Sequence, residues 1–258
     1  MSSETPESTP PAQPRPSSGI PMMPIGLSFF TVGLSLAVVL YSTKNRAKRM
    51  EATEPPKANL AAGAEADLAN RQFQPLSKPL QELLNDATYV SVPTQAHPLL
   101  GQLAPDFTLQ DSDGNAWKLA DATAKGPVIV VFYYGYYCDH CVSQLFGLKK
   151  DLAKFTELGA TIVAISADPV EETRARLKEY GTFGYPVLSD PENQVATRYA
   201  TFTPAKSPDE EGALMHGTFV IDRAGRIVWA NRGDQPFIAN QTLLQEIHRR
   251  DQAAKSSR

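Results

Sequence analysis

Cysteine is scarce in this sequence: there are two among 258 residues, Cys138 and Cys141. A scaffold held by disulfides needs bridges between distant segments, so this count excludes one. A bond between two residues so close in sequence would close a very short loop and stabilise the fold little. The two cysteines are therefore expected to serve chemistry rather than stability.

Two further classes of site lack their usual residues. A structural zinc site normally takes four Cys or His ligands, and this chain holds one Cys-x-x-Cys, four histidines and no paired histidine motif. The net charge is −3, with acidic and basic residues well mixed, whereas a nucleic-acid-binding domain shows a basic patch or stripe. We expect no nucleic-acid partner, no metal and no cofactor.

Charge is absent between Arg15 and Lys44. Residues 20–42 inside this interval are mostly apolar, and about 20 apolar residues in a helix match the hydrocarbon thickness of a bilayer. A cleavable signal peptide would instead place basic residues before the apolar run and a small-residue cleavage site just after it. A core helix is the other alternative, but the segment stands apart from any globular pattern. We predict a single transmembrane helix over residues 20–42, with the lipid bilayer as its partner.

Four basic residues follow this apolar run, namely Lys44, Arg46, Lys48 and Arg49. The positive-inside rule places such a flank on the cytoplasmic side of a membrane, or on the equivalent matrix or stromal side. The large domain would then lie on that side, although the opposite orientation stays open.

The remaining chain divides by composition. Residues 1–19 are rich in Pro, Ser and Thr and are expected to be a disordered tail. Residues 43–100 are interpreted as a basic juxtamembrane segment and a spacer, with one short helical candidate near Pro79–Asn85. Residues 101–250 form the expected globular domain, and residues 251–258 a C-terminal tail.

Strand and helix patterns alternate in the globular part. Continuous apolar runs at 128–133 and 161–166 predict strands buried on both faces. Apolar residues at helical spacing follow the cysteines as far as Gly159, and Asp168-Pro169 is expected to cap a second helix that ends at Gly181. A hairpin over 217–230 and a helix over 240–250 complete a three-layer α/β domain.

The position of Cys138 favours a reactive thiol. It stands where a buried strand gives way to a helix, and the free N–H groups and dipole of a helix N-terminus stabilise a thiolate. Cys141, one helical turn later, can attack a mixed disulfide or sulfenic acid formed at Cys138. Between them, a protonated His140 would favour the thiolate and an ionised Asp139 would oppose it, so we expect an intermediate reduction potential.

Three segments resemble the alkyl hydroperoxide reductase/thiol-specific antioxidant (AhpC/TSA) superfamily. They are LAPDFTLQDSDGNAWKLAD (103–121), PVLSDPENQVATRYATFTP (186–204) and GTFVIDRAGRIVWANRG (217–233). The resemblance implies a thioredoxin fold, with three α/β/α layers, a mixed central sheet and a peroxiredoxin-style N-terminal extension. It also implies a peroxide or protein-disulfide substrate and a thioredoxin-like or other dithiol reductant.

The segment around the cysteines departs from typical members of that family. Gly135 stands where they carry a Thr or Ser that helps to bind peroxide, and His216 stands where they carry an arginine. By the same resemblance, Gly217-Thr218 takes the place of the cis-proline that faces the Cys-x-x-Cys, with His216 nearby. His216 is either a partly exposed turn residue or a group that tunes the thiolate.

Three hypotheses of function follow. The first is a membrane-anchored oxidoreductase that reduces peroxides or protein disulfides through Cys138 and Cys141. The second is a copper chaperone that holds Cu(I) with these cysteines and His216, since soft ligands suit this ion. The third is an accessory subunit of a membrane complex. Four tyrosines around the site are expected to pack in the core and rim, or else to line a substrate groove: Tyr133, Tyr134, Tyr136 and Tyr137.

Overall fold

The computed structural model describes residues 59–136, 138–207 and 212–256, which belong to one compact unit spanning residues 58–258. The predicted disordered tail, the predicted transmembrane helix over 20–42 and the basic flank lie outside the described residues. Among the residues that are described, no helix is both long enough and apolar enough to cross a membrane.

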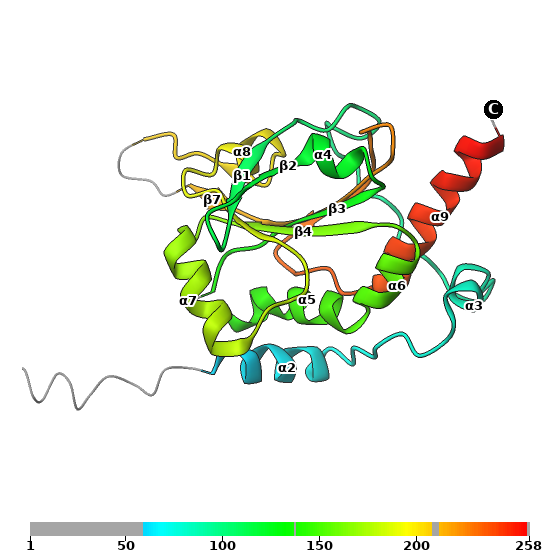
Figure 1. The fold of residues 1–258 in the computed structure, drawn as a ribbon, viewed down its shortest axis with the longest axis horizontal. Helices are drawn as coiled ribbons and strands as arrows, with labels where there is room; N and C mark the ends of the chain where they lie inside the picture. Colours follow the sequence, from blue (N-terminus) through cyan, green and yellow to red (C-terminus); the bar gives the residue numbers. More distant parts are fainter. Residues whose placement is uncertain (1–58, 137, 208–211, 257–258) are drawn as a thin grey trace, which may run out of the picture. The chain divides into compact units, whose positions relative to one another are not determined.

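A seven-stranded mixed sheet lies at the centre of this unit (Figure 1). Its strand order is β2-β1-β5-β4-β3-β8-β9; β3, β4 and β5 run parallel, and each of the other pairings is antiparallel. A separate two-stranded ribbon joins β6 and β7. The strands are β1 (Thr108–Asp111), β2 (Ala116–Lys118), β3 (Val128–Phe132), β4 (Thr161–Ser166), β5 (Val187–Ser189), β6 (Phe202–Thr203), β7 (Ala213–Leu214), β8 (His216–Ile221) and β9 (Ile227–Gly233).

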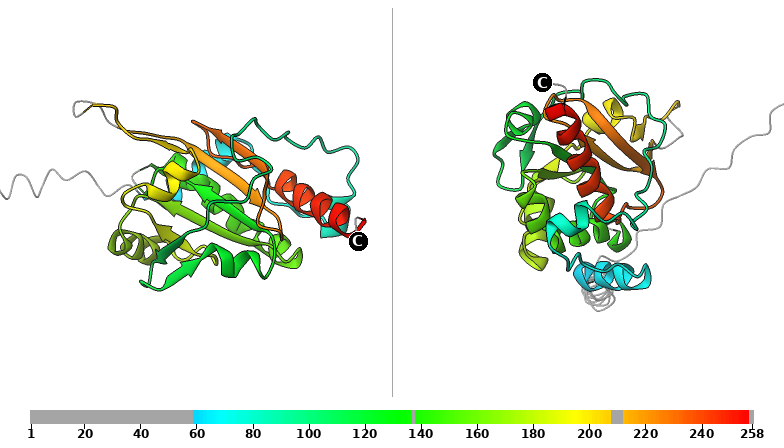
Figure 2. Two further views of the ribbon diagram at one scale, coloured as in Figure 1. Left: turned by 90° about the horizontal axis from the view of Figure 1, so that it is seen from above. Right: turned by 90° about the vertical axis from the view of Figure 1, so that its right-hand side faces the viewer.

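Helices cover both faces of the sheet (Figures 1 and 2). They are α2 (Leu60–Asn70), α3 (Leu80–Leu84), α4 (Leu119–Thr123), α5 (Asp139–Lys150), α6 (Leu152–Glu157), α7 (Val170–Tyr180), α8 (Gln194–Arg198) and α9 (Asn240–Ser256). One face packs against α4 and α8, and the other against α5, α6, α7 and α9. The predicted three-layer arrangement with a mixed sheet is confirmed.

Strand β3 explains why the core has two halves. All five of its residues are buried, and successive side chains in a strand point to opposite faces. Ile129 and Val131 accordingly pack in the cluster under α5, whereas Val130 and Phe132 pack in the cluster under α4 and α8. This central strand leads directly to the segment that holds the cysteines.

Residues 59–100 do not form the spacer that their composition suggested. Helix α2 lies along α5 and buries Leu60, Ala64 and Leu68 in the core cluster on that side (Figure 1). Three apolar residues spaced four apart give a helix one narrow apolar stripe. This stripe packs in the same core cluster as the buried apolar residues of α5. The compact unit therefore begins about forty residues before Gly101, the expected start of the domain.

An extended segment at residues 92–97, which we call the strap, covers the edge of the sheet. Gln95 N–H donates to the carbonyl of Ala230 in β9 (2.8 Å), and Ala230 N–H donates to Thr94 Oγ1 (2.9 Å). Trp229 Nε1 also donates to the carbonyl of Val92 (3.1 Å). An exposed edge strand is a template for pairing with other chains, so the strap protects β9.

Three helix boundaries differ from the expected ones. The helix that follows the cysteines is interrupted at Asp151, whose buried carboxylate accepts hydrogen bonds from Leu76 N–H and Asn240 Nδ2, and α6 then ends before Gly159. The residue before α7 is Pro169, and the side chain of Asp168 does not cap that helix. The last helix reaches Ser256, so the expected C-terminal tail is largely helical.

Candidate active site around the Cys138–Cys141 disulfide

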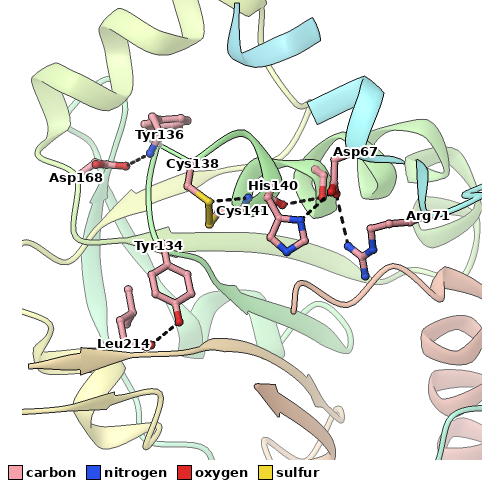
Figure 3. The surroundings of a disulfide bond; sticks show 10 residues. Asp67, Arg71, Tyr134, Tyr136, Cys138, His140, Cys141, Asp168 and Leu214 are labelled. Carbon is pink, nitrogen blue, oxygen red and sulfur yellow. Dashed lines mark hydrogen bonds and ion pairs between the residues drawn. A yellow bond between two sulfur atoms is a disulfide. The ribbon is translucent and has the colours of Figure 1, made fainter. Parts of the chain in front are cut away.

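Cys138 and Cys141 are joined by a disulfide at the N-terminus of α5 (Figure 3). Cys138 is the N-cap residue, and its Sγ accepts a hydrogen bond from the backbone N–H of Cys141 (3.2 Å). The same N–H would stabilise a thiolate on Cys138 once the disulfide is reduced. Cys138 is partly exposed, whereas only 3% of Cys141 is exposed. The sulfur of Cys138 is therefore the one that a partner molecule can reach.

The loop between β3 and Cys138 is held by Asp168. Its carboxylate accepts hydrogen bonds from Tyr136 N–H (3.1 Å) and from the Ser166 hydroxyl (3.0 Å). Burial raises the pKa of Asp168, and these two hydrogen bonds only partly offset the effect. Gly135 has φ +116°, a conformation that L side chains rarely adopt. Asp168, which was expected to cap the following helix, thus accepts a hydrogen bond from the active-site loop.

His140 is held by a residue that sequence analysis did not identify. Its Nδ1 lies 2.8 Å from Oδ1 of Asp67, which projects from α2 (Figure 3). Burial alone would raise the pKa of Asp67, but hydrogen bonds from His140 and Ser143 outweigh it and lower the pKa. Arg71 lies 3.7 Å away on the other side of this carboxylate. Asp67 therefore remains ionised beside the imidazole.

His216 is neither exposed nor in a turn, so the prediction of a partly exposed turn residue is wrong. It begins β8, only 2% of it is exposed, and neither ring nitrogen has a hydrogen-bond partner among the described residues. Burial, followed by the charges of His140 and Arg71, lowers the pKa of His216 to about 4. The ring centroid lies 4.7 Å from that of Tyr134 and 6.3 Å from that of His140. An uncharged imidazole thus stands where the family arginine was expected.

Gly217 and Thr218 lie in β8, opposite Phe132 and Val131 of β3. No peptide bond among the described residues is cis, so Gly217-Thr218 lacks the geometry of a cis-proline. A β-carbon on Gly217 would collide with Thr201 Cγ2, which explains the glycine. The Thr218 hydroxyl accepts a hydrogen bond from Gln144 Nε2 of α5 (2.8 Å) and ties the strand to the active-site helix.

The tyrosines mostly pack in the core, as expected. Tyr133 and Tyr136 are buried, and their rings meet edge to face at 5.7 Å. Tyr134 is half-buried, and its hydroxyl donates to the carbonyl of Leu214 in the β6–β7 ribbon (2.6 Å). Tyr137 lies outside the described residues. Tyr134 is thus the described tyrosine that links the site to that ribbon.

A metal site is not formed in the part of the chain that the structure describes. There, no three His, Cys, Asp or Glu side chains are grouped as a metal ion would need. His216 is therefore not grouped with the two cysteines in the way that the Cu(I) hypothesis requires.

Two functional candidates, Asp67 and Asp168, were not recognised from sequence as site residues. Each lies on another element than the cysteines and reaches the site only through tertiary packing. For Asp67, the available signal was the spacing of Leu60, Ala64 and Leu68, which predicts a packed helix rather than a spacer. No local signal distinguishes Asp168 from an ordinary helix cap.

Comparison with known proteins identifies similar sequences over the same region. Residues 100–230 match the AhpC/TSA family. Alkyl hydroperoxide reductase E of Mycobacterium tuberculosis is 30% identical over 146 residues, which are 56% of this chain and 92% of that protein. The chloroplastic peroxiredoxin Q of Gentiana triflora is 32% identical over 128 residues, or 49% of this chain and 56% of that protein.

Solved structures show a similar fold. Peroxidoxin BcpB from Mycobacterium tuberculosis superposes with a TM-score of 0.54 at 25% identity, covering 59% of this chain and 98% of the other. A 2-Cys peroxiredoxin of Plasmodium vivax gives 0.52 at 20% identity, covering 61% and 99%, and supports the fold alone. The predicted thioredoxin-like fold is confirmed.

Proposed function

The chain belongs to the AhpC/TSA family and is a thiol-dependent oxidoreductase, and we propose that Cys138 and Cys141 carry its chemistry as a dithiol–disulfide pair. The observation that carries this proposal is the difference in exposure between two bonded sulfurs. Cys138 is accessible and has a backbone donor at its Sγ, whereas Cys141 is buried one helical turn later. These are the properties of an attacking thiol and of a resolving thiol.

With a hydroperoxide as substrate, the cycle has three steps. The Cys138 thiolate attacks the terminal peroxide oxygen, the O–O bond breaks, and an alcohol or water leaves as Cys138 becomes a sulfenic acid. The Cys141 thiolate then attacks that sulfur, and water leaves as the disulfide forms. A dithiol reductant of the thioredoxin kind restores both thiols and becomes a disulfide itself.

Stopped-flow oxidation of the reduced full-length protein by hydrogen peroxide tests this cycle. Cys138→Ser is expected to abolish the reaction, because the exposed nucleophile is lost. Cys141→Ser is expected to keep the first step and to accumulate a sulfenic acid that dimedone traps. A Cys138→Ser protein that reacts as fast as the wild type contradicts the assignment of roles.

A protein disulfide is the second candidate substrate, and two observations favour it. No side-chain hydroxyl exists at Gly135, and the nearest group there is the Asp168 carboxylate rather than a hydrogen-bond donor. His216 is uncharged at neutral pH and supplies no cation for a peroxide oxygen. A thiolate that attacks a disulfide needs neither group, because the leaving thiolate carries the charge away.

The same kinetic experiment separates the two candidates. A peroxide rate constant no larger than that of free cysteine, together with reduction of a disulfide-bonded protein such as insulin, identifies a disulfide reductase. A peroxide reaction much faster than that of free cysteine identifies a peroxidase and shows that the site binds peroxide without the usual hydroxyl and arginine.

A further inference from the structure

Helix α2 brings a carboxylate into the active site from outside the family region. The match to the AhpC/TSA family begins at residue 100, and α2 covers Leu60–Asn70. The helix packs along α5, the helix that begins at the cysteines, and the side chain of Asp67 turns toward His140 (Figure 3). Asp67 and His140 are both partly shielded, with 20% and 33% of their side chains exposed.

The carboxylate of Asp67 is itself fixed in place. Its Oδ1 lies 2.8 Å from His140 Nδ1, and its Oδ2 lies 3.7 Å from Arg71 Nη1. Arg71 in turn donates from Nη2 to the carbonyl of Pro236 (2.7 Å), so the pair is anchored to the loop before α9. A carboxylate held on both sides can orient an imidazole with little loss of side-chain entropy.

This contact determines which nitrogen of His140 can exchange a proton. A carboxylate accepts only, so Nδ1 carries the hydrogen in their contact, and Nε2 of the neutral ring holds the free lone pair. Nε2 is buried and has no hydrogen-bond partner among the described residues. In Figure 3 the ring is drawn between the Asp67 carboxylate and the disulfide, and His140 immediately precedes Cys141 in the chain. His140 is thereby prepared to act as a base and, once protonated, as an acid.

We propose that Asp67 is a positioning residue for the redox pair, acting through His140, which exchanges protons with the cysteines during the dithiol–disulfide cycle. The inference rests on the proposed role of Cys138 and Cys141. When a dithiol reduces the disulfide, its thiolate attacks Cys138 Sγ, the S–S bond breaks, and Cys141 leaves as a thiolate. The imidazolium of His140 donates the proton from Nε2 to Cys141. The second thiol of the reductant loses its proton to solvent, attacks the mixed disulfide and forms the reductant's own disulfide, and Cys138 leaves as a thiolate. Oxidation returns the proton to Nε2.

Few other charged or titratable groups interact with His140 in the described residues. Arg71, the residue that follows α2, holds Asp67 from its far side, and the His216 ring of β8 lies 6.3 Å from the His140 ring between centroids. His216 is uncharged at neutral pH, because its pKa lies at about 4. His216 is therefore not the group to which the exchanged proton is assigned.

A double-mutant cycle tests the inference directly. The full-length wild type, Asp67→Asn, His140→Gln and the double variant are oxidised, and their reduction by dithiothreitol is followed by quenched alkylation from about pH 5 to pH 8, where imidazole titrates. Each single variant is expected to react about tenfold more slowly near neutral pH, a modest share of what general acid–base catalysis supplies. The double variant is expected to be no slower than His140→Gln, since Asp67 acts through that residue. If the rate losses of the two single variants multiply in the double variant, the inference is wrong.

Two further variants separate positioning from packing. Glu65→Gln removes the ion pair between Glu65 and Lys150 (3.0 Å), which joins the same two helices without touching His140. It is expected to change the rate by less than about twofold, because exposed pairs contribute little. Asp67→Glu keeps the carboxylate and is expected to restore part of the rate. A Glu65→Gln protein as slow as Asp67→Asn overturns the inference, because helix packing then explains the loss.

Failure of this inference is distinguishable from failure of the proposed function. Reduction by dithiothreitol involves neither a peroxide nor a protein substrate. A wild type that cannot form and reduce the Cys138–Cys141 disulfide contradicts the proposed function. A wild type that cycles normally, with unaltered rates and pH profile in Asp67→Asn, contradicts only the role of Asp67.

Discussion

The carboxylate of Asp168 fills the space that a side chain on Gly135 would need. A β-carbon at Gly135 would lie 2.8 Å from both oxygens of Asp168, and the backbone φ of +116° disfavours any side chain there. The carboxylate is committed to that place because it accepts the hydrogen bond from Tyr136 N–H. A Thr or Ser at position 135, as in typical family members, would therefore conflict with the carboxylate that holds the loop before Cys138.

Gly135→Ala tests this relationship. The substitution is expected to lower the free energy of unfolding by about 3 kcal/mol, because a non-glycine residue in such a conformation costs about 1–3 kcal/mol before any steric conflict. Urea denaturation of the oxidised protein measures it. Gly233→Ala is the matched control, since a β-carbon there meets no atom within 4 Å. Equal losses in the two variants contradict the steric explanation.

His216 is expected to make the stability of the protein depend on pH. Its pKa in the folded state is about 4, below the ordinary value of 6.5. The folded state therefore favours the uncharged ring, and this contribution is present above about pH 6.5 and is lost as the pH falls through about 4. The wild type should lose about 3 kcal/mol more than His216→Leu between about pH 7 and pH 4. Denaturant titrations at several pH values measure the difference, and parallel curves for the two proteins contradict it.

The central strands were predictable because each carries its own signal. Residues 161–166 form β4 with the predicted boundaries, and the apolar run that begins at Val128 forms β3. Both runs are rich in β-branched residues and are buried on both faces, so the pattern does not depend on their partners. The hairpin of β8 and β9 also follows from adjacent residues, through the turn at Gly225.

The role of Asp168 could not be predicted in this way. The residues Asp168-Pro169 have the composition of a helix cap, yet the carboxylate turns to a backbone N–H 32 positions earlier in the chain. A buried N–H without a partner costs about 1–3 kcal/mol, more than a helix cap typically contributes. Only the folded chain shows that Tyr136 needs this acceptor. The ion pair between Asp67 and His140 escaped sequence analysis for the same reason, since its partners are 73 positions apart.

The strap supplies a third prediction. Thr94→Ala removes the acceptor for Ala230 N–H, and the variant is expected to lose about 1–3 kcal/mol of stability, the cost of a buried donor without a partner. Hydrogen exchange at the Ala230 amide should accelerate as well. Thr123→Ala is the control, because within the described part of the chain that hydroxyl bonds to carbonyls of its own helix alone. If both variants lose the same stability, the strap does not protect the edge of β9.

Membrane attachment through residues 20–42 stays a prediction from sequence. The full-length protein is expected to remain in membranes washed with carbonate, and Leu34→Arg is expected to release part of it, because an arginine near the centre of a span costs about 3 kcal/mol. Ala52→Arg, outside the span, serves as the control. A wild-type protein that carbonate extracts completely contradicts the prediction. Accessibility of Cys138 to an impermeant maleimide, after reduction, then reports the side on which the domain lies.

The outer position of α2 and the strap has a consequence for the order in which the chain folds. Both segments leave the ribosome before the elements on which they rest, since α5 and β9 follow them in the chain. They cannot dock until those elements exist, so α2 must wait for α5 and the strap for β9. Peripheral segments of this kind can open locally at a lower free energy than global unfolding. Undocking of α2 alone would withdraw Asp67 from His140 and leave the disulfide and the sheet in place.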